Sequence, residues 1–221
     1  MPGPEPMIDA VVFDLDGVLI DSEHVWDEAR RELAAERGGR WTETASRDMM
    51  GMSSLEWSRY MHDVIGVPDS PEEISREVVR RLEEIYRRDL PLVDGAVEAV
   101  ERLAARWPIG LASSSNRELI DLVLDLSGLA RYFRTTVSSE EVSRGKPEPD
   151  VYLEAARRLE VSPERCAAIE DSDAGIRSAK AAGMRVLAIP NPQFPPEDDA
   201  LALADDVPGS LAELTPERVE P

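Results

Sequence analysis

Short apolar runs and longer amphipathic stretches alternate along most of the chain. The apolar runs have the length and composition of buried strands. They occupy residues 8–13, 108–112, 135–137, 166–169 and 185–189. Between them, apolar residues recur three and four positions apart, as on helices with one buried face, over 96–105, 118–126, 149–159 and 174–182. This alternation predicts an α/β fold, a Rossmann-like parallel sheet core with helices on both faces.

The rhythm changes between the first two predicted strands. Residues 22–90 carry long charged helical patterns over 26–36, 53–65 and 72–86, and no good strand candidate. We therefore expect a small α-helical cap domain at 22–90, inserted into a core domain made of 1–21 and 91–221. After Pro190 the chain is rich in proline and acidic residues, and we expect either a last short strand and helix over 205–214 or frayed chain.

Composition and charge narrow the classes of partner. The 221 residues carry 45 acidic and 25 basic side chains, a net charge of -20, which repels nucleic acid and anionic lipid. No apolar stretch approaches the ~20 residues of a membrane span, residues 1–6 lack a basic signal region, and the only cysteine, Cys166, lies in an apolar run. We expect a cytoplasmic protein, with no nucleic-acid or membrane partner, for which a monomer suffices.

Chemistry-bearing residues gather where predicted strands end. They are Asp14 and Asp16 with Gly17, then Ser113, Ser114 and Ser115, then Lys146, and last Glu170, Asp171 and Ser172. Taken singly, each is an ordinary turn, helix cap or solvated residue. Taken together, they all fall at the carboxyl ends of parallel strands, where open α/β sheets bind their ligands. The set supplies acidic groups for a cation and a hydroxyl and an ammonium for an anion.

These motifs resemble the haloacid dehalogenase-like hydrolase superfamily, and within it the helical-cap branch of small sugar phosphatases and β-phosphoglucomutase. The first motif is Asp14-Leu15-Asp16-Gly17, Ser113 follows 99 residues after Asp14, Lys146 another 33 on, and Asp171 another 25 on. The resemblance covers about residues 10–189. It implies a small-molecule phosphate ester as the partner.

The resemblance implies a role for each catalytic residue. Asp14 would attack phosphorus to give an aspartyl-phosphate, and Asp16 would protonate the leaving oxygen and later accept a proton from water. Lys146 and Ser113 would hold the phosphoryl oxygens, and Gly17 and Ser114 would join them in binding the substrate.

The resemblance also implies Mg²⁺ as the cofactor. Its ligands would be the side chains of Asp14 and Asp171 and the backbone carbonyl of Asp16, with Glu170 in support. A divalent cation and one lysine would give this strongly acidic chain a local site for an anion.

Other functions of the same fold are weighed against particular residues. Asp16 argues against a dehalogenase, and the absence of lysine from 22–90 excludes the Schiff base of a phosphonatase. A catalytically inactive binding protein stays open, although no motif residue is missing. The tryptophans of the cap, Trp26 among them, are expected in its core.

A β-phosphoglucomutase-like phosphomutase is the main alternative. Mutase relatives carry a cap arginine after a Gly-x-Ser turn, a cap lysine, and a histidine ten residues after the second aspartate. Here Ser54 follows the turn, the cap has no lysine, and Trp26 occupies the histidine position, with His24 as the only candidate substitute. We therefore expect a Mg²⁺-dependent phosphatase acting on a sugar or polyol phosphate, without a cap cation to hold a second phosphate.

Overall fold

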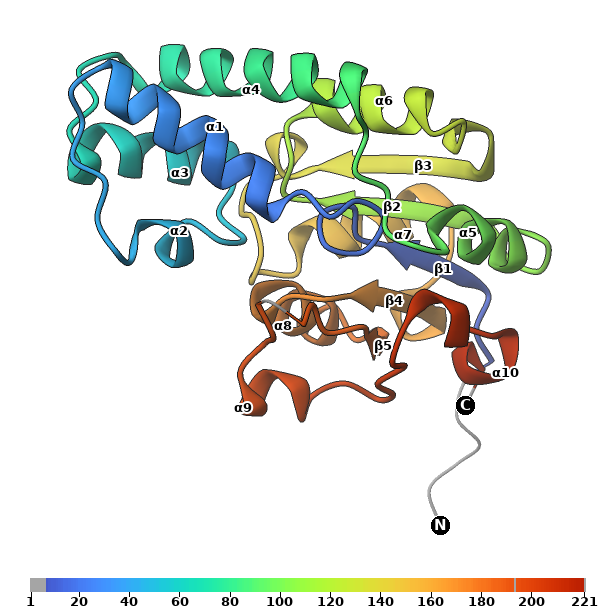
Figure 1. The fold of residues 1–221 in the computed structure, drawn as a ribbon. Helices are drawn as coiled ribbons and strands as arrows, with labels where there is room; N and C mark the ends of the chain where they lie inside the picture. The colour runs from blue at the N-terminus through green and yellow to red at the C-terminus, as the bar shows by residue number, and fades with distance from the viewer. Residues whose placement is uncertain (1–6, 193, 221) are drawn as a thin grey trace.

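A single parallel sheet forms the centre of the molecule. The computed structural model describes residues 7–192 and 194–220, so the lead-in at 1–6 lies outside it. The strands are β1 (Ala10–Phe13), β2 (Ile109–Ser113), β3 (Phe133–Ser138), β4 (Cys166–Glu170) and β5 (Arg185–Ala188). They are all parallel and lie in the order β3-β2-β1-β4-β5 (Figure 1). All five predicted strands are present.

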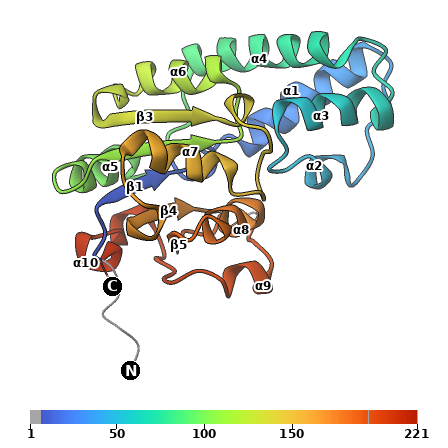
Figure 2. The same ribbon diagram turned by 180° about the vertical axis from the view of Figure 1, so that it is seen from behind.

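Helices cover both faces of this sheet because alternate strand residues point to opposite sides. Ala10 and Val12 face one core cluster with α7 (Asp150–Leu159) and α8 (Asp173–Ala181), whereas Val11 and Phe13 face the other cluster. The second cluster includes α5 (Ala96–Ala104) and α6 (Arg117–Leu126), on the opposite side from α7 in Figures 1 and 2. The predicted Rossmann-like α/β core is confirmed.

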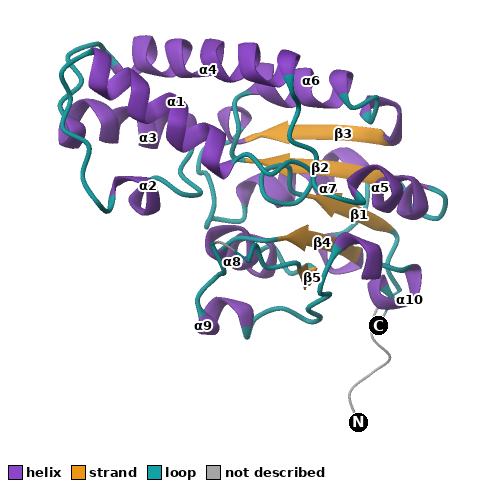
Figure 3. Cartoon of the chain, viewed as in Figure 1, coloured by secondary structure: helices purple, strands orange, loops and turns teal. Residues whose placement is uncertain are grey.

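Four further helices lie between β1 and β2. They are α1 (Glu23–Glu36), α2 (Ala45–Asp48), α3 (Ser54–Tyr60) and α4 (Pro71–Arg88), and a π-helical turn at Met61–Ile65 follows α3. The sequence pattern did not predict α2, which is only one turn long. Figure 3 shows these helices beside the ends to which the strand arrows point. We keep the boundaries of the cap domain as a proposal.

The two chain segments that connect these helices to the sheet run side by side. The Asp21 N–H donates to the Pro91 carbonyl at 2.8 Å, and Ile20 forms an antiparallel bridge with Leu92. Two adjacent crossings of this kind are where a hinge between the two parts would lie.

The C-terminal segment differs from the prediction. It contains α9 (Asp198–Leu201), a 3₁₀ turn at Leu211–Glu213 and α10 (Pro216–Val219), and within its described residues a single bridge from Asp206 to Leu187 replaces the predicted strand. The Asp205 carboxylate accepts from the Val186 N–H at 2.8 Å, so a side chain occupies a donor that a sheet partner would otherwise use. None of the described helices has the length and apolar character to cross a membrane.

Candidate active site

A cleft of about 340 Å³ lies between the carboxyl ends of the strands and the helices that follow β1. Both the sheet and the inserted helices supply its walls. On the sheet side it is lined by Asp14, Asp16, Ser114, Ser115, Lys146 and Asp171. The structure therefore brings together residues that lie up to 157 positions apart in the sequence.

Lys146 is the centre of a buried ion cluster. Its Nζ lies 2.9 Å from Asp14 Oδ1 and 2.6 Å from Glu170 Oε1, and all three side chains are at most 8% exposed. Burial by itself would lower the pKa of Lys146, but the Asp14 and Glu170 carboxylates outweigh burial and raise it. Lys146 is therefore charged at neutral pH and fixed beside Asp14.

The acidic residues of the site carry more charge than the lysine neutralises. Carboxylate oxygens of Asp14, Glu170 and Asp171 all lie within 4.8 Å of one another, and in the described part of the chain one cation, Lys146, forms ion pairs with two of them, Asp14 and Glu170. Burial is the main cause that raises the pKa of Asp14 to about 8 and the pKa of Asp171 well above its ordinary value, and Glu170 raises both further. Lys146 opposes both increases.

These residues fit a divalent cation. With all three carboxylates ionised, the Lys146 ammonium balances one of their three negative charges, and a divalent cation would balance the other two. The buried Asp171 Oδ1 has no hydrogen-bond partner among the described residues. Hard oxygen ligands of this kind are those that Mg²⁺ prefers.

Two glycines make room for this cluster. A Cβ atom at Gly17 would lie 1.9 Å from Asp171 Oδ2, and one at Gly175 would lie 1.9 Å from Glu170 Oε1. Gly17 also has a φ of +78°, which other residues rarely adopt. The resemblance implies that Gly17 helps to bind the substrate, and in the structure the neighbour that requires a glycine there is Asp171.

Glu170 has no oxygen left without a protein donor. Its Oε1 accepts from Lys146 Nζ and from the Tyr152 hydroxyl, each at 2.6 Å. Its Oε2 accepts from the Asp171 N–H at 3.1 Å and the Ser172 hydroxyl at 3.2 Å. We therefore propose that Glu170 positions Lys146, and that its contribution to the metal site is through charge.

The Asp16 carboxylate lies outside the acidic cluster. Its Oδ1 accepts from Ser22 Oγ at 2.5 Å and from the Trp26 indole N–H at 3.1 Å, and its Oδ2 accepts from Ser115 Oγ at 2.6 Å. Since Ser22 and Trp26 begin the inserted helices and Ser115 follows β2, both parts of the molecule hold this carboxylate. The predicted metal contact of Asp16 involves its backbone carbonyl, and that contact stays a prediction.

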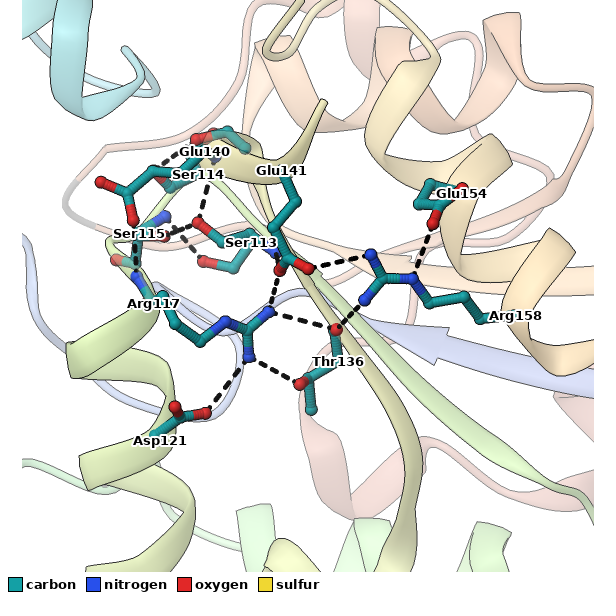
Figure 4. Close-up of polar contacts among 12 residues, drawn as sticks. Ser113, Ser114, Ser115, Arg117, Asp121, Thr136, Glu140, Glu141, Glu154 and Arg158 are labelled. Atoms are coloured by element: carbon teal, nitrogen blue, oxygen red, sulfur yellow. Dashed lines mark hydrogen bonds and ion pairs between the residues drawn. The ribbon is translucent and has the colours of Figure 1, made fainter. Parts of the chain in front are cut away.

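The serine loop after β2 is fixed from behind (Figure 4). Ser113 is fully buried and lies behind the cleft wall, where its Oγ accepts from the Ser115 N–H at 2.9 Å. The carbonyls of Ser114 and Ser115 accept from the hydroxyls of Ser139 at 3.0 Å and Ser138 at 2.7 Å. The roles predicted for Ser113 and Ser114 in holding phosphoryl oxygens stay predictions.

An ion-pair network supports this loop. Arg117, which follows the serines, pairs with Glu141 and donates to Thr136 Oγ1 at 2.7 Å, while Arg158 lies 2.8 Å from the same glutamate (Figure 4). The network joins α6, α7 and the end of β3, so the loop is anchored to three elements.

The haloacid dehalogenase-like hydrolase family matches residues 8–183. The chain belongs to this family. It is similar to hexitol phosphatase B of Escherichia coli strain K12, with 34% identity over 93% of this chain and 94% of that protein. It is also 34% identical to the phosphorylated carbohydrates phosphatase of Thermotoga maritima, over 80% of this chain and 82% of that one. The crystal structure of CbbY from Rhodobacter sphaeroides in complex with phosphate is similar at 27% identity, a TM-score of 0.82 and coverage of 94% and 96%.

The inserted helices of this haloacid dehalogenase-like hydrolase supply residues that the sequence pattern did not single out. Glu23, Arg30, Arg47 and Trp57 line the cleft, together with Trp26. Two arginines of the inserted helices therefore line the cleft, although neither stands directly after the Gly-x-Ser turn. The signal was present in the sequence, because positions 23, 26 and 30 share one face of a helix that would otherwise be filled with apolar residues.

The structure places His24 away from the cleft and Trp26 in its wall. His24 is exposed and is not among the residues that line the cleft. Trp26, at the position where mutase relatives carry histidine, donates its indole N–H to Asp16 and is buried in the hydrophobic cluster. Trp26 is thus both a core residue, as expected, and part of the cleft wall.

Phe194, which is 40% exposed, borders the same cleft.

Proposed function

We propose that the chain is a Mg²⁺-dependent phosphatase that hydrolyses a small phosphomonoester, a sugar or polyol phosphate, through an aspartyl-phosphate intermediate. The observation that carries this proposal is that the two aspartates after β1 lie in different surroundings. Asp14 lies in the buried cluster with Lys146, and Asp16 lies outside it with hydroxyl and indole donors. The two groups therefore have different environments for different chemistry.

In the first half-reaction, an Asp14 carboxylate oxygen forms a bond to phosphorus while the bond from phosphorus to the leaving oxygen breaks. Asp16 gives its proton to that oxygen, so an alcohol departs. Its four hydrogen-bond partners include Ser113 Oγ, 3.5 Å from Oδ2, and they fix the direction in which the proton is delivered.

In the second half-reaction, water attacks phosphorus and transfers a proton to Asp16. The bond from Asp14 to phosphorus breaks, inorganic phosphate leaves, and both aspartates return to their starting forms. Lys146 holds a phosphoryl oxygen throughout, while Glu170 keeps the ammonium in place. The backbone after β2, with Ser114, faces the other phosphoryl oxygens.

Asp14 and Asp171, with the Asp16 carbonyl, would hold Mg²⁺. When bound, the ion supplies the positive charge that this acidic cluster lacks and lowers the repulsion between the carboxylates and an anionic substrate. The net charge of -20 further favours a small ester over nucleic acid as the partner.

A phosphomutase is the second candidate, because Arg30 and Arg47 line the cleft and a mutase must hold a second phosphate. Incubation with β-glucose 1-phosphate and a trace of the 1,6-bisphosphate separates the two activities. We expect inorganic phosphate to accumulate faster than glucose 6-phosphate. The reverse order would establish the mutase.

The proposed activity is tested by release of phosphate from 4-nitrophenyl phosphate, with Mg²⁺ and with a chelator. We expect turnover only with Mg²⁺. A panel of sugar, polyol and nucleoside monophosphates then identifies the preferred class. No release from any of these esters, in protein that is folded by circular dichroism and binds Mg²⁺, would favour the inactive binding protein.

A further inference from the structure

The wall of the cleft opposite the strand ends contains a buried arginine held between two aromatic rings. The Arg30 guanidinium carbon lies 4.6 Å from the centre of the Trp26 ring and 4.8 Å from that of Trp57, and the residue is 7% exposed. The two rings meet edge to face, with centres 5.7 Å apart. This packing fixes the guanidinium in one orientation.

Arg30 forms no hydrogen bond or ion pair within the described part of the chain, and its buried Nε has no partner there. Burial lowers its pKa to about 10, against the effect of Glu23 and other carboxylates, so it stays charged at neutral pH. A buried cation without a hydrogen-bond acceptor is costly. Because Arg30 lines the cleft, a ligand in the cleft is the available source of that acceptor.

Glu23 lies on the same face of α1, two helical turns before Arg30, and also lines the cleft. Within residues 7–192 and 194–220, it forms no ion pair with Arg30 within 4.0 Å and no hydrogen bond through its side chain. Burial is the main cause that raises the pKa of Glu23 to about 7, and the charge of Asp16 raises it further. This wall thus presents a hydrogen-bond donor, Arg30, and an acceptor, Glu23, that do not bind each other.

This combination matches hydroxyl groups better than a second phosphate. A hydroxyl both donates and accepts, whereas guanidinium only donates and carboxylate only accepts, so neighbouring hydroxyls satisfy both residues. A second phosphate would be attracted by Arg30 but repelled by the Glu23 carboxylate. The Trp26 and Trp57 rings offer apolar surface to the carbon chain that carries the hydroxyls.

We infer that Glu23 and Arg30 form a hydroxyl-recognition subsite, which selects monophosphates of polyols and sugars and disfavours bisphosphates. The inference rests on the proposed phosphatase function, since it names the part of the substrate beyond the reacting phosphate. It makes Glu23 and Arg30 specificity-determining residues.

The test compares two subsite variants with two matched controls on the same helix. Glu23→Gln and Arg30→Met change the cleft wall, while Glu28→Gln and Arg31→Met make the same replacements at exposed positions of α1. For each protein, kcat/KM is measured with sorbitol 6-phosphate, with 4-nitrophenyl phosphate, which has no free hydroxyl, and with fructose 1,6-bisphosphate.

We expect the ratio of kcat/KM for sorbitol 6-phosphate to that for 4-nitrophenyl phosphate to fall at least about tenfold in both subsite variants and to stay within about twofold in the controls. Glu23→Gln should also raise the kcat/KM for the bisphosphate relative to that for sorbitol 6-phosphate. Unchanged ratios in folded Glu23→Gln and Arg30→Met proteins would overturn the inference. If Arg30→Met fails to fold, the ratio in Glu23→Gln decides.

Failure of the phosphatase proposal gives a different result, because then no protein in the set turns over 4-nitrophenyl phosphate. In that case calorimetric binding of sorbitol 6-phosphate to the parent and to Glu23→Gln tests the subsite alone. At least about tenfold weaker binding by the variant supports the subsite, and equal binding overturns it.

Discussion

The two walls of the cleft differ in how their charged side chains are paired within the protein. On the sheet side, both oxygens of Glu170 and both oxygens of Asp16 accept from protein donors, and Lys146 is paired twice. On the helix side, Arg30 is buried and Glu23 is part-buried, and neither has a hydrogen bond to another side chain in the described structure. Groups held by the protein are fixed for a reaction common to many substrates, while groups left unpartnered are available to a particular ligand.

The difference in pairing follows from the elements that form each wall, strand ends on one side and helices on the other. Strand ends in a parallel sheet lie side by side, so their polar residues meet each other and become mutual partners. The face of α1 at 23, 26 and 30 lines the cleft, and of these three side chains only Trp26 has a hydrogen-bond partner, Asp16, in the described structure. The comparison is sharpened by changing one wall at a time.

The largest effect is expected from Asp14→Asn. The amide has nearly the same volume but cannot attack phosphorus, so kcat should fall more than about 10³-fold while the fold is retained. Phosphate release and circular dichroism check the two parts of this prediction. Activity within tenfold of the parent would exclude Asp14 as the nucleophile.

Asp171→Asn separates the metal site from the rest of the sheet wall. We expect kcat/KM to fall roughly 10²-fold and the Mg²⁺ concentration for half-maximal activity to rise. In the presence of a chelator the variant should be more stable than the parent by ~1 kcal/mol, because the amide has no ionised form for burial to disfavour. Half-saturation at the parent's Mg²⁺ concentration, or lower stability in chelator, would show that Asp171 is not a ligand.

Gly175→Ala tests how closely the sheet wall is packed. The added Cβ would overlap Glu170 and should lower the free energy of unfolding by ~2 kcal/mol, with loss of activity through displacement of Lys146. Gly128→Ala is the control, since nothing lies within 4 Å of its Cβ position and only its positive φ is strained. Urea denaturation gives both values, and an equal cost at the two positions would contradict the close packing of Glu170.

Trp26→Phe tests one of the two contacts, with Ser22 and with Trp26, by which the inserted segment holds Asp16. The phenyl ring keeps apolar surface in the wall but removes the indole N–H donor to Asp16 Oδ1. We expect kcat to fall by about three- to tenfold and KM for 4-nitrophenyl phosphate to change less. Steady-state kinetics measure both constants, and an unchanged kcat would mean that the serine donors alone position Asp16.

The smallest effect concerns Glu141, behind the serine loop. Burial alone would raise its pKa, but the Ser138 N–H and the Arg117 and Arg158 side chains outweigh burial and hold the pKa at about 2. A depressed pKa in the folded state adds stability above the unfolded value of 4.5, and that stability is lost as pH falls toward 2. Glu141→Gln should therefore cost ~1 kcal/mol at pH 7 and progressively less below pH 4.5. Denaturation at several pH values checks this, and a cost independent of pH would contradict it.

The sequence by itself determined the core and the sheet wall of the site. Short continuous apolar runs predicted all five strands, and polar residues directly after those runs were bound to meet, because parallel strands end at one edge. Asp14, Asp16 and Asp171 follow from this local rule, whereas Lys146 lies eight residues past the end of β3. The further strand considered over 205–214 is reduced to a bridge from Asp206 to Leu187, where the Asp205 carboxylate, rather than a backbone carbonyl, accepts from the Val186 N–H.

Tertiary structure alone decided how the helices after β1 face the cleft. Helical periodicity places residues 23, 26 and 30 on one face but does not say what that face packs against. Only the packing of α1 on α3 and the closeness of both to the strand ends make Arg30 a buried, unpartnered cation. Tertiary structure also explains Gly175. A side chain at this position would overlap Glu170, and this is visible only in the folded structure. Contacts between elements distant in sequence depend on the whole packed core, which no local pattern encodes.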